Sequence, residues 1–204
     1  MVLSKETEQP GADGFSLYIN RLLGALTYNL ESKADLYDDK TKKEIFLLNN
    51  YHFINKRLEN NKALLEIGAK TQPKFGSNYS ALALERRENF MSYWEKMEEF
   101  TNVEGLKLAS GKSTDKEKTI IKEKFKNFNN SFEELITKCM KTTIFNDDLA
   151  TELKTEIHKK LVDNYGTFLK TFEKKDFTSK PEKYLKYTKD SLAEKISSLF
   201  DKSV

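Results

Sequence analysis

The sequence predicts an all-α protein made of antiparallel helices, because periodicity, turn residues and composition agree. Apolar residues recur at three- and four-residue spacing, and no stretch alternates in the manner of a strand. Only 8 Gly and 3 Pro occur in 204 residues, whereas parallel α/β folds use more glycine at ligand-binding turns. Charged residues make up 33% and aromatic residues 12%, which favours an elongated helical body with much surface per residue.

The N-terminal half is predicted to hold a flexible leader, residues 1–13, followed by three long helices. A short helical turn precedes the third helix, and Pro73 and Gly76 break it. The long helices are expected over about 14–37, 39–60 and 77–101. The side chains expected to face inward are Phe15, Ile19, Leu22, Leu23, Leu26, Leu30, Ile45, Leu48, His52, Phe53, Leu82, Phe90, Tyr93, Trp94, Met97 and Phe100.

Capping signals place two long helices in the C-terminal half. Thr114-x-x-Glu117 has the pattern of a capping box and opens a helix that runs to about Lys141. Asn146 is expected to cap a helix over about 147–174. The side chains expected to face inward are Ile121, Phe125, Phe128, Phe132, Leu135, Ile136, Leu149, Leu153, Ile157, Leu161, Tyr165, Phe168 and Phe172.

Two short helices are predicted to close the chain. Pro181 suits the first turn of one helix, and Thr188 is a cap for the last helix. The helical region as a whole is expected over 14–204. It has room for two stacked bundles, over about 14–110 and 111–204.

The residue patterns that usually mark catalysis or metal binding do not assemble in this sequence. Gly105 and Gly111-Lys112-Ser113 are separated by five residues, whereas the phosphate-binding motif needs four between its glycines. His52 and His158 lie on different predicted helices, so they form no i, i+4 metal pair. Cys139 is expected to be a packed thiol, and a single cysteine suits a reducing cytosol. We therefore expect no enzyme, no metal and no cofactor.

The distribution of charge is more informative than its total. A net charge of +3 is too small for a general nucleic-acid binder. Residues 1–40 carry a net charge of −3, and residues 154–189 carry ten Lys against five acidic residues. The start of the chain lacks the pattern of a signal peptide, and no apolar run is long enough to span a bilayer. The positive pole therefore lies toward the C-terminus.

A short stretch near the positive pole is predicted to face an anionic membrane. If residues 181–187 are helical, Lys183 and Lys186 share one face, which Lys189 could extend. The two tyrosines between these lysines suit the headgroup level of a bilayer. An anionic leaflet attracts each surface lysine by about 1 kcal/mol within a Debye length of about 8 Å. The alternative interpretation is a set of solvated surface lysines.

Five short segments occur in an order and at a spacing that identify a protein family more specifically than any one segment does. They are Ala34-Asp35-Leu36-Tyr37, residues 45–54, residues 122–129, residues 181–187 and Leu199-Phe200-Asp201. Together they resemble the C-terminal region of the exocyst complex component seven family, the seventy-kilodalton exocyst subunit. The animal form is the nearest match, because Phe177-Thr178 lead into the closing motif.

The resemblance implies an elongated rod of antiparallel helical bundles that tethers secretory vesicles without catalysis. It implies binding of phosphatidylinositol 4,5-bisphosphate, with Lys183 and Lys186 at the matching positions. We expect Lys180 and Lys189 to assist, and Lys174 and Lys175 to add long-range attraction. The implied partners are other exocyst subunits, a Rho-type GTPase and the actin-branching complex, with no nucleic acid.

The implied location is cytoplasmic and peripheral, at the inner face of the plasma membrane. A different class of function stays open beside this one. A helical protein–protein scaffold without lipid contact would place its positive pole against an acidic protein surface.

Overall fold

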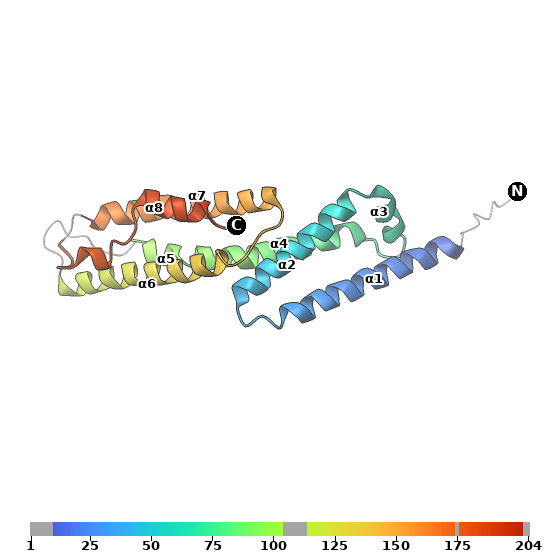
Figure 1. Ribbon diagram of the computed structural model, residues 1–204, viewed down its shortest axis with the longest axis horizontal. Helices are drawn as coiled ribbons and strands as arrows, with labels where there is room; N and C mark the ends of the chain where they lie inside the picture. Colours follow the sequence, from blue (N-terminus) through green and yellow to red (C-terminus); the bar gives the residue numbers. More distant parts are fainter. Residues whose placement is uncertain (1–9, 104–113, 174–175, 202–204) are drawn as a thin grey trace, which may run out of the picture. The chain divides into compact units, whose positions relative to one another are not determined.

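The computed structural model describes residues 10–103, 114–173 and 176–201, and all regular structure in these ranges is helical. This confirms the predicted all-α fold. Figure 1 shows α1 and α2 running in opposite directions, as α6 and α7 do. The elements are α1 (Pro10–Ala34), α2 (Lys40–Glu59), α3 (Lys62–Ala69), α4 (Phe75–Glu95), α5 (Glu98–Thr101), α6 (Asp115–Cys139), α7 (Asp147–Phe172), the 3-10 helix η1 (Pro181–Lys183) and α8 (Lys189–Ser197).

The chain forms two compact units, Met1–Arg87 and Glu88–Val204, called unit 1 and unit 2 below. Their boundary falls within α4, and the predicted division near residue 110 stays a prediction. Helix α1 begins at Pro10, earlier than expected, because proline suits the first helical position. Residues 1–9 of the predicted leader lie outside the described residues, as do Gly105 and Gly111-Lys112-Ser113.

The helix starts follow the capping signals of the sequence. The Thr114 hydroxyl accepts from Glu117 N, and the Glu117 carboxylate accepts from Thr114 N at 2.7 Å. Asn146 Oδ1 accepts from Leu149 N at 2.8 Å. Thr188 forms a second capping box, with Ser191. The three predicted caps are therefore confirmed, because each depends only on residues three apart in the chain.

The core of unit 2 is aromatic. Phe125, Phe128 and Phe132 of α6 are all completely buried. The Phe125 ring lies 4.4 Å from the Phe168 ring of α7, measured between centroids, and the Phe128 ring lies 4.6 Å from that of Tyr165. The prediction that the α6 phenylalanines form core packing is confirmed. Trp94 of α4 belongs to the same unit and is also fully buried.

The inward face predicted for α1 is wrong at three positions. Phe15, Leu22 and Leu26 are exposed by 51%, 55% and 39%, whereas Ile19 and Leu30 are buried as expected. The helix is turned so that a neighbouring stripe of small and polar side chains meets the other helices of unit 1. This second stripe includes Ser16, Asn20, Thr27 and Ala34.

Hydrogen bonds explain the rotation of α1. Asn20 Nδ2 donates to Gly68 O of α3 at 3.1 Å and to Thr71 Oγ1 at 2.7 Å. The hydroxyls of Thr27 and Tyr79 share a hydrogen bond of 2.8 Å. A buried amide or hydroxyl without a partner would cost about 1–3 kcal/mol. The observed orientation of α1 satisfies these groups and also buries Ile19, Leu30 and Ala34.

Two side chains of α2 and one helix boundary also differ from the prediction. Phe53 of α2 was expected to face inward but is 59% exposed, and the Arg57 guanidinium lies over its ring, 5.0 Å from the centroid. His52 is half-buried. The predicted helix over 77–101 is interrupted, because α4 ends at Glu95 and a separate short helix, α5, follows.

Candidate functional site

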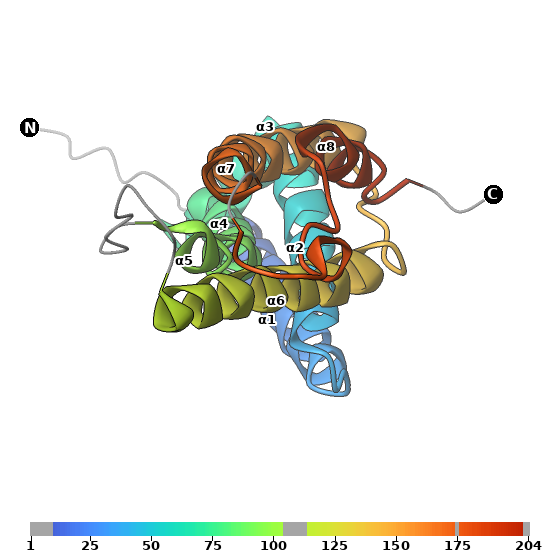
Figure 2. The same ribbon diagram turned by 90° about the vertical axis from the view of Figure 1, so that its left-hand side faces the viewer.

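The chain between α7 and α8 carries the predicted lysines, and we call residues 180–189 the lysine segment. Figure 2 shows it passing beside α6 and then turning to α8. Only Pro181–Lys183 form a turn of 3-10 helix, and the backbone is irregular from Tyr184 to Tyr187. The prediction of a helix over 181–187 is therefore wrong, and so is the shared helical face of Lys183 and Lys186.

Side chains of α6 and α7 hold this irregular path. Asn129 Nδ2 donates to Tyr184 O, and the Tyr165 hydroxyl donates to Tyr187 O, each at 2.9 Å. Burial raises the pKa of the Tyr165 hydroxyl, so it remains a proton donor at neutral pH. Within the segment, Leu185 N donates to Pro181 O at 2.8 Å, but the carbonyls of Tyr184 and Tyr187 accept from distant side chains instead of continuing a helix.

The lysine segment displays its basic side chains to solvent. Lys180, Lys183, Lys186 and Lys189 are all exposed. The Lys183 ammonium lies over the Tyr184 ring, 5.8 Å from its centroid. Lys174 and Lys175, the predicted auxiliary lysines, lie outside the described residues.

Two of the four lysines are paired with carboxylates of the helices beneath them. Lys186 Nζ donates to Glu133 Oε1 of α6 at 2.8 Å, and Lys189 Nζ donates to Asp163 Oδ1 of α7 at 2.7 Å. The Tyr187 hydroxyl donates to the same Glu133 oxygen at 3.1 Å. The sequence did not indicate these carboxylates, since 53 and 26 residues separate them from their lysines.

The electrostatics of the two pairs follow from these contacts. Hydrogen bonding from Lys186, aided by Tyr187, holds the pKa of Glu133 below its usual range. Burial, then the hydrogen bond to Glu133, raises the pKa of Tyr187 to about 12. The Lys189 hydrogen bond lowers the pKa of Asp163 in the same way. Both carboxylates are therefore ionised at neutral pH and offset part of the positive charge of the segment.

Lys195 of α8 is a further basic group at this site that sequence reasoning missed. Its charge contributes to the lowered pKa of Glu133, and its side chain is exposed.

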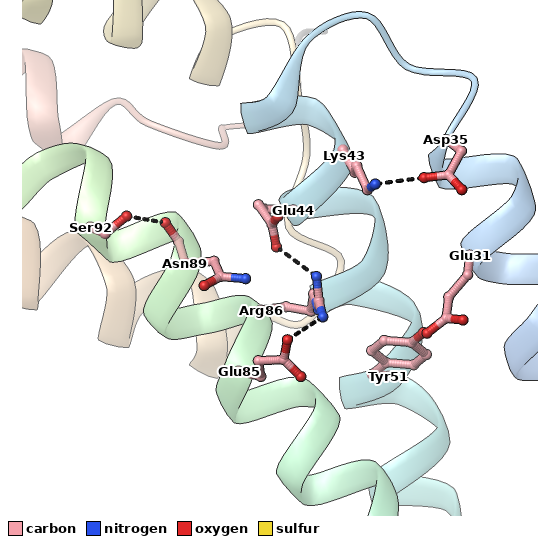
Figure 3. Close-up of polar contacts among 9 residues, drawn as sticks. All are labelled: Glu31, Asp35, Lys43, Glu44, Tyr51, Glu85, Arg86, Asn89 and Ser92. Carbon is pink, nitrogen blue, oxygen red and sulfur yellow. Dashed lines mark hydrogen bonds and ion pairs between the residues drawn. The ribbon is translucent and has the colours of Figure 1, made fainter.

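A cluster of charged and polar side chains in unit 1 has a different character, shown in Figure 3. Arg86 of α4 contacts Glu44 of α2, with 3.5 Å between Nη1 and Oε2, and it also pairs with Glu85. The side chains of Arg86 and Glu44 are only 17% and 11% exposed. A partly buried pair of this kind depends on both partners being present. The arrangement therefore fits a structural link between α2 and α4.

The same close-up shows two contacts between α2 and the region of α1. Lys43 Nζ lies 2.6 Å from Asp35 Oδ1, and the Tyr51 hydroxyl donates to Glu31 Oε1 at 3.2 Å (Figure 3). Burial, then the charge of Glu31, raises the pKa of Tyr51. Tyr51 is therefore a fixed hydrogen-bond donor at neutral pH.

Among the described residues of unit 2, charged side chains contribute to open hollows of two different sizes. One of about 560 Å³ includes Glu95, and one of about 370 Å³ includes Lys154 and His158. Two of the lining groups form ion pairs: Glu95 lies 2.6 Å from Lys160, and Lys154 lies 2.6 Å from Asp201. His158 is exposed, whereas Cys139 is buried as expected of a packed thiol.

A metal ion would need several ligating side chains close together, and a bilayer would need a long apolar helix. Among the described residues, no group of three or more His, Cys, Asp or Glu side chains is placed to hold a metal ion. Within the same ranges, every helix is too short or too polar to cross a membrane.

The fold and the lysine segment define an all-helical protein with a basic surface held against its bundle by ion pairs. Residues 2–198 match the family model that describes the C-terminal part of Exo70, a component of the exocyst complex. The chain therefore belongs to this family, and the resemblance seen in the sequence is confirmed.

Individual relatives agree with the family assignment. Human exocyst complex component 7 is 36% identical over 92% of this chain and 26% of its own length. The Drosophila melanogaster protein of the same name is 28% identical over 92% of this chain and 27% of its own length. The chain thus spans about a quarter of the length of these curated relatives.

Solved structures support the fold. A structure reported for exocyst subunit Exo70p and the Exo84p C-terminal domains matches with a TM-score of 0.60 and 26% identity, over 80% of this chain and 30% of that chain. A structure of S. cerevisiae Exo70 matches with a TM-score of 0.63 over 98% of this chain and 38% of that chain. At 22% identity the second match supports the fold alone.

Proposed function

We propose that this chain acts as the C-terminal part of a non-catalytic exocyst tethering subunit. Its lysine segment would dock onto phosphatidylinositol 4,5-bisphosphate at the inner face of the plasma membrane during exocytosis. The observation that carries the proposal is the exposure of Lys180, Lys183, Lys186 and Lys189 on one segment between α7 and α8.

The physical basis is attraction between ammonium groups and phosphate. Each lysine near an anionic leaflet contributes about 1 kcal/mol, and the gain decays within a Debye length of about 8 Å. A headgroup with several phosphate charges can contact more than one lysine, which favours it over a singly charged lipid. Such docking is peripheral and sensitive to salt.

The structure changes which lysines should contribute most. Lys186 and Lys189 already contact carboxylates, so part of their attraction for a membrane is offset. Lys180 and Lys183 have no ion pair within the described residues, and we propose that they make the leading contacts. The half-buried Tyr184 beside Lys183 would then lie close to the headgroup level.

Membership of the family also supports proposals about partners. Human and fly relatives are named as components of the exocyst complex, and we propose that this chain contacts other exocyst subunits. A Rho-type GTPase and the actin-branching complex are further proposed partners. The division of the helical region into two stacked bundles, about 14–110 and 111–204, is likewise a proposal.

The test is vesicle flotation with and without phosphatidylinositol 4,5-bisphosphate. Lys180→Ala/Lys183→Ala should weaken binding by about thirtyfold, because two contributions of about 1 kcal/mol each are lost. A matched control, Lys62→Ala/Lys70→Ala, removes the same charge from exposed positions of α3 and its C-cap in unit 1. The control should change binding by less than about twofold. Equal losses in the two variants would count against the assignment.

The alternative function is a helical protein–protein scaffold without lipid contact. The exposed apolar stripe of α1, which includes Phe15 and Leu22, favours some protein contact. This alternative expects association with partner subunits that persists at high salt, together with no flotation on any vesicle. Loss of flotation on raising the salt concentration would support lipid docking instead.

A further inference from the structure

Two carboxylates next to the lysine segment compete with an anionic ligand for its lysines. Glu133 accepts hydrogen bonds from both Lys186 and Tyr187, at 2.8 and 3.1 Å. Asp163 accepts from Lys189 at 2.7 Å. A phosphate group that approaches Lys186 or Lys189 therefore meets an ammonium group whose charge is already partly offset.

We propose that Glu133 and Asp163 limit membrane affinity by occupying Lys186 and Lys189, so that docking exchanges each carboxylate for a lipid phosphate. This inference rests on the proposed function. It assigns to two acidic residues on α6 and α7 a role in regulating the strength of lipid binding.

The exchange is physically accessible because both ion pairs lie at the surface. The side chains of Lys186 and Glu133 are 41% and 43% exposed, and those of Lys189 and Asp163 are 50% and 72% exposed. Pairs of this exposure are weak and screened by salt. A phosphate with more than one negative charge can therefore displace the carboxylate without unfolding the bundle.

Glu133 should be the stronger of the two competitors. It is the less exposed carboxylate and accepts from both Lys186 and Tyr187, whereas Asp163 is more exposed and accepts from Lys189. The Lys195 ammonium on α8 also acts on Glu133 electrostatically. Neutralising Glu133 would therefore release Lys186.

The geometry keeps Lys189 close to its carboxylate. A Cβ atom placed on Gly166 of α7 would lie 3.1 Å from Lys189 Cδ, so the aliphatic stem of Lys189 runs close over this glycine. Asp163 lies one helical turn before Gly166. The stem is therefore guided toward Asp163, and only its terminal ammonium needs to move for the exchange.

The test is a double-mutant cycle with the full chain and vesicles of phosphatidylcholine containing phosphatidylinositol 4,5-bisphosphate. Glu133→Gln keeps an acceptor for Tyr187 but removes the charge, and it should raise vesicle affinity about two- to fivefold. In a Lys186→Ala background the same substitution should lose most of this effect, because the released lysine is absent.

Glu134→Gln is the matched control, since Glu134 lies next to Glu133 on α6 and pairs with Lys138 at 2.8 Å instead. It removes the same charge and should raise affinity less than Glu133→Gln. The inference would be overturned if Glu133→Gln raised vesicle affinity equally in the wild-type and Lys186→Ala backgrounds. It would also be overturned if Glu133→Gln raised affinity no more than Glu134→Gln does. Circular dichroism of each variant confirms that the helices are retained.

The outcomes separate this inference from the proposed function. If Lys180→Ala/Lys183→Ala weakens vesicle binding but Glu133→Gln leaves it unchanged, the proposed function is supported and the proposed role of Glu133 as a competitor is overturned. Absence of vesicle binding by every form overturns both. A gain of affinity that depends on Lys186 supports both.

Discussion

Helices α1 and α6 each contain 25 residues, but they use their apolar residues differently. Along α6, Phe125, Phe128 and Phe132 are completely buried, whereas along α1 Phe15 and Leu22 are more than half exposed. Periodicity shows where an apolar stripe lies on a helix. Periodicity alone does not show whether another helix covers that stripe.

The two helices also differ in what fixes their orientation. Helix α6 is oriented by aromatic packing, such as the Phe128 ring stacked on the Tyr165 ring of α7, with 4.6 Å between centroids. Helix α1 is oriented by polar contacts, such as Asn20 with Gly68 O of α3. Hydrogen bonds constrain direction more narrowly than apolar contacts do, so α1 takes the rotation that satisfies them.

The largest expected effect tests the comparison directly. Phe128→Ala should lower the free energy of unfolding by about 3–5 kcal/mol, because it opens a cavity in the core of unit 2. Phe15→Ala, the same change at an exposed position of α1, should alter it by less than about 0.5 kcal/mol. Urea denaturation followed by circular dichroism measures both. A large loss from Phe15→Ala would show that its ring is covered in solution.

A smaller effect is expected where glycine permits close packing. A Cβ on Gly68 of α3 would lie 2.3 Å from Phe75 Cδ1, and the Phe75 ring is buried, so Gly68→Ala should destabilise by about 1–3 kcal/mol. Gly166→Ala in α7 meets only the flexible stem of Lys189 and gains helix propensity of about 1 kcal/mol. Gly166→Ala should therefore cause no loss of stability. Thermal unfolding of the two variants compares them, and equal losses would contradict this interpretation.

The smallest effect concerns the pH dependence of unit 2. The pKa of Glu133 is lowered from 4.5 in the folded chain, so its contribution to stability is complete above that value and is lost as the pH falls below it. Because Glu133 is 43% exposed, solvent screening limits the loss to about 0.5 kcal/mol. Urea denaturation at pH values of about 6 and about 3 should show this step in the wild type.

Glu133→Gln supplies the control for this measurement. The variant lacks the titrating carboxylate, so its stability should fall less between the two pH values than that of the wild type. The opposite end of the range gives a second check. The pKa of Tyr187 is raised from 10.0 to about 12, so its contribution is present below the lower value and is lost as the pH rises toward the higher one.

Features that depend on neighbouring residues could be predicted from the sequence. The caps at Thr114, Asn146 and Thr188 each involve partners three positions away, and the all-α class follows from periodicity. The aromatic core of α6 and α7 was predictable because its stripes are continuous. The lysine segment was indicated both by the excess of lysine over residues 154–189 and by the family resemblance.

Features that depend on distant residues could not be predicted. In place of the helix expected after Pro181 the chain follows an irregular path, in which Asn129, 55 residues earlier than Tyr184, donates to the Tyr184 carbonyl. The pairing of Lys186 with Glu133 spans 53 residues. No local pattern encodes such contacts, and they decide how much charge the lysine segment presents.

The burial of two unique side chains has a practical consequence. The sequence contains one Trp and one Cys, and both Trp94 and Cys139 are fully buried within unit 2. Indole fluorescence and thiol labelling therefore monitor the opening of that half alone. Neither probe would detect local unfolding of α1 and α3, whereas backbone amide hydrogen exchange would detect it.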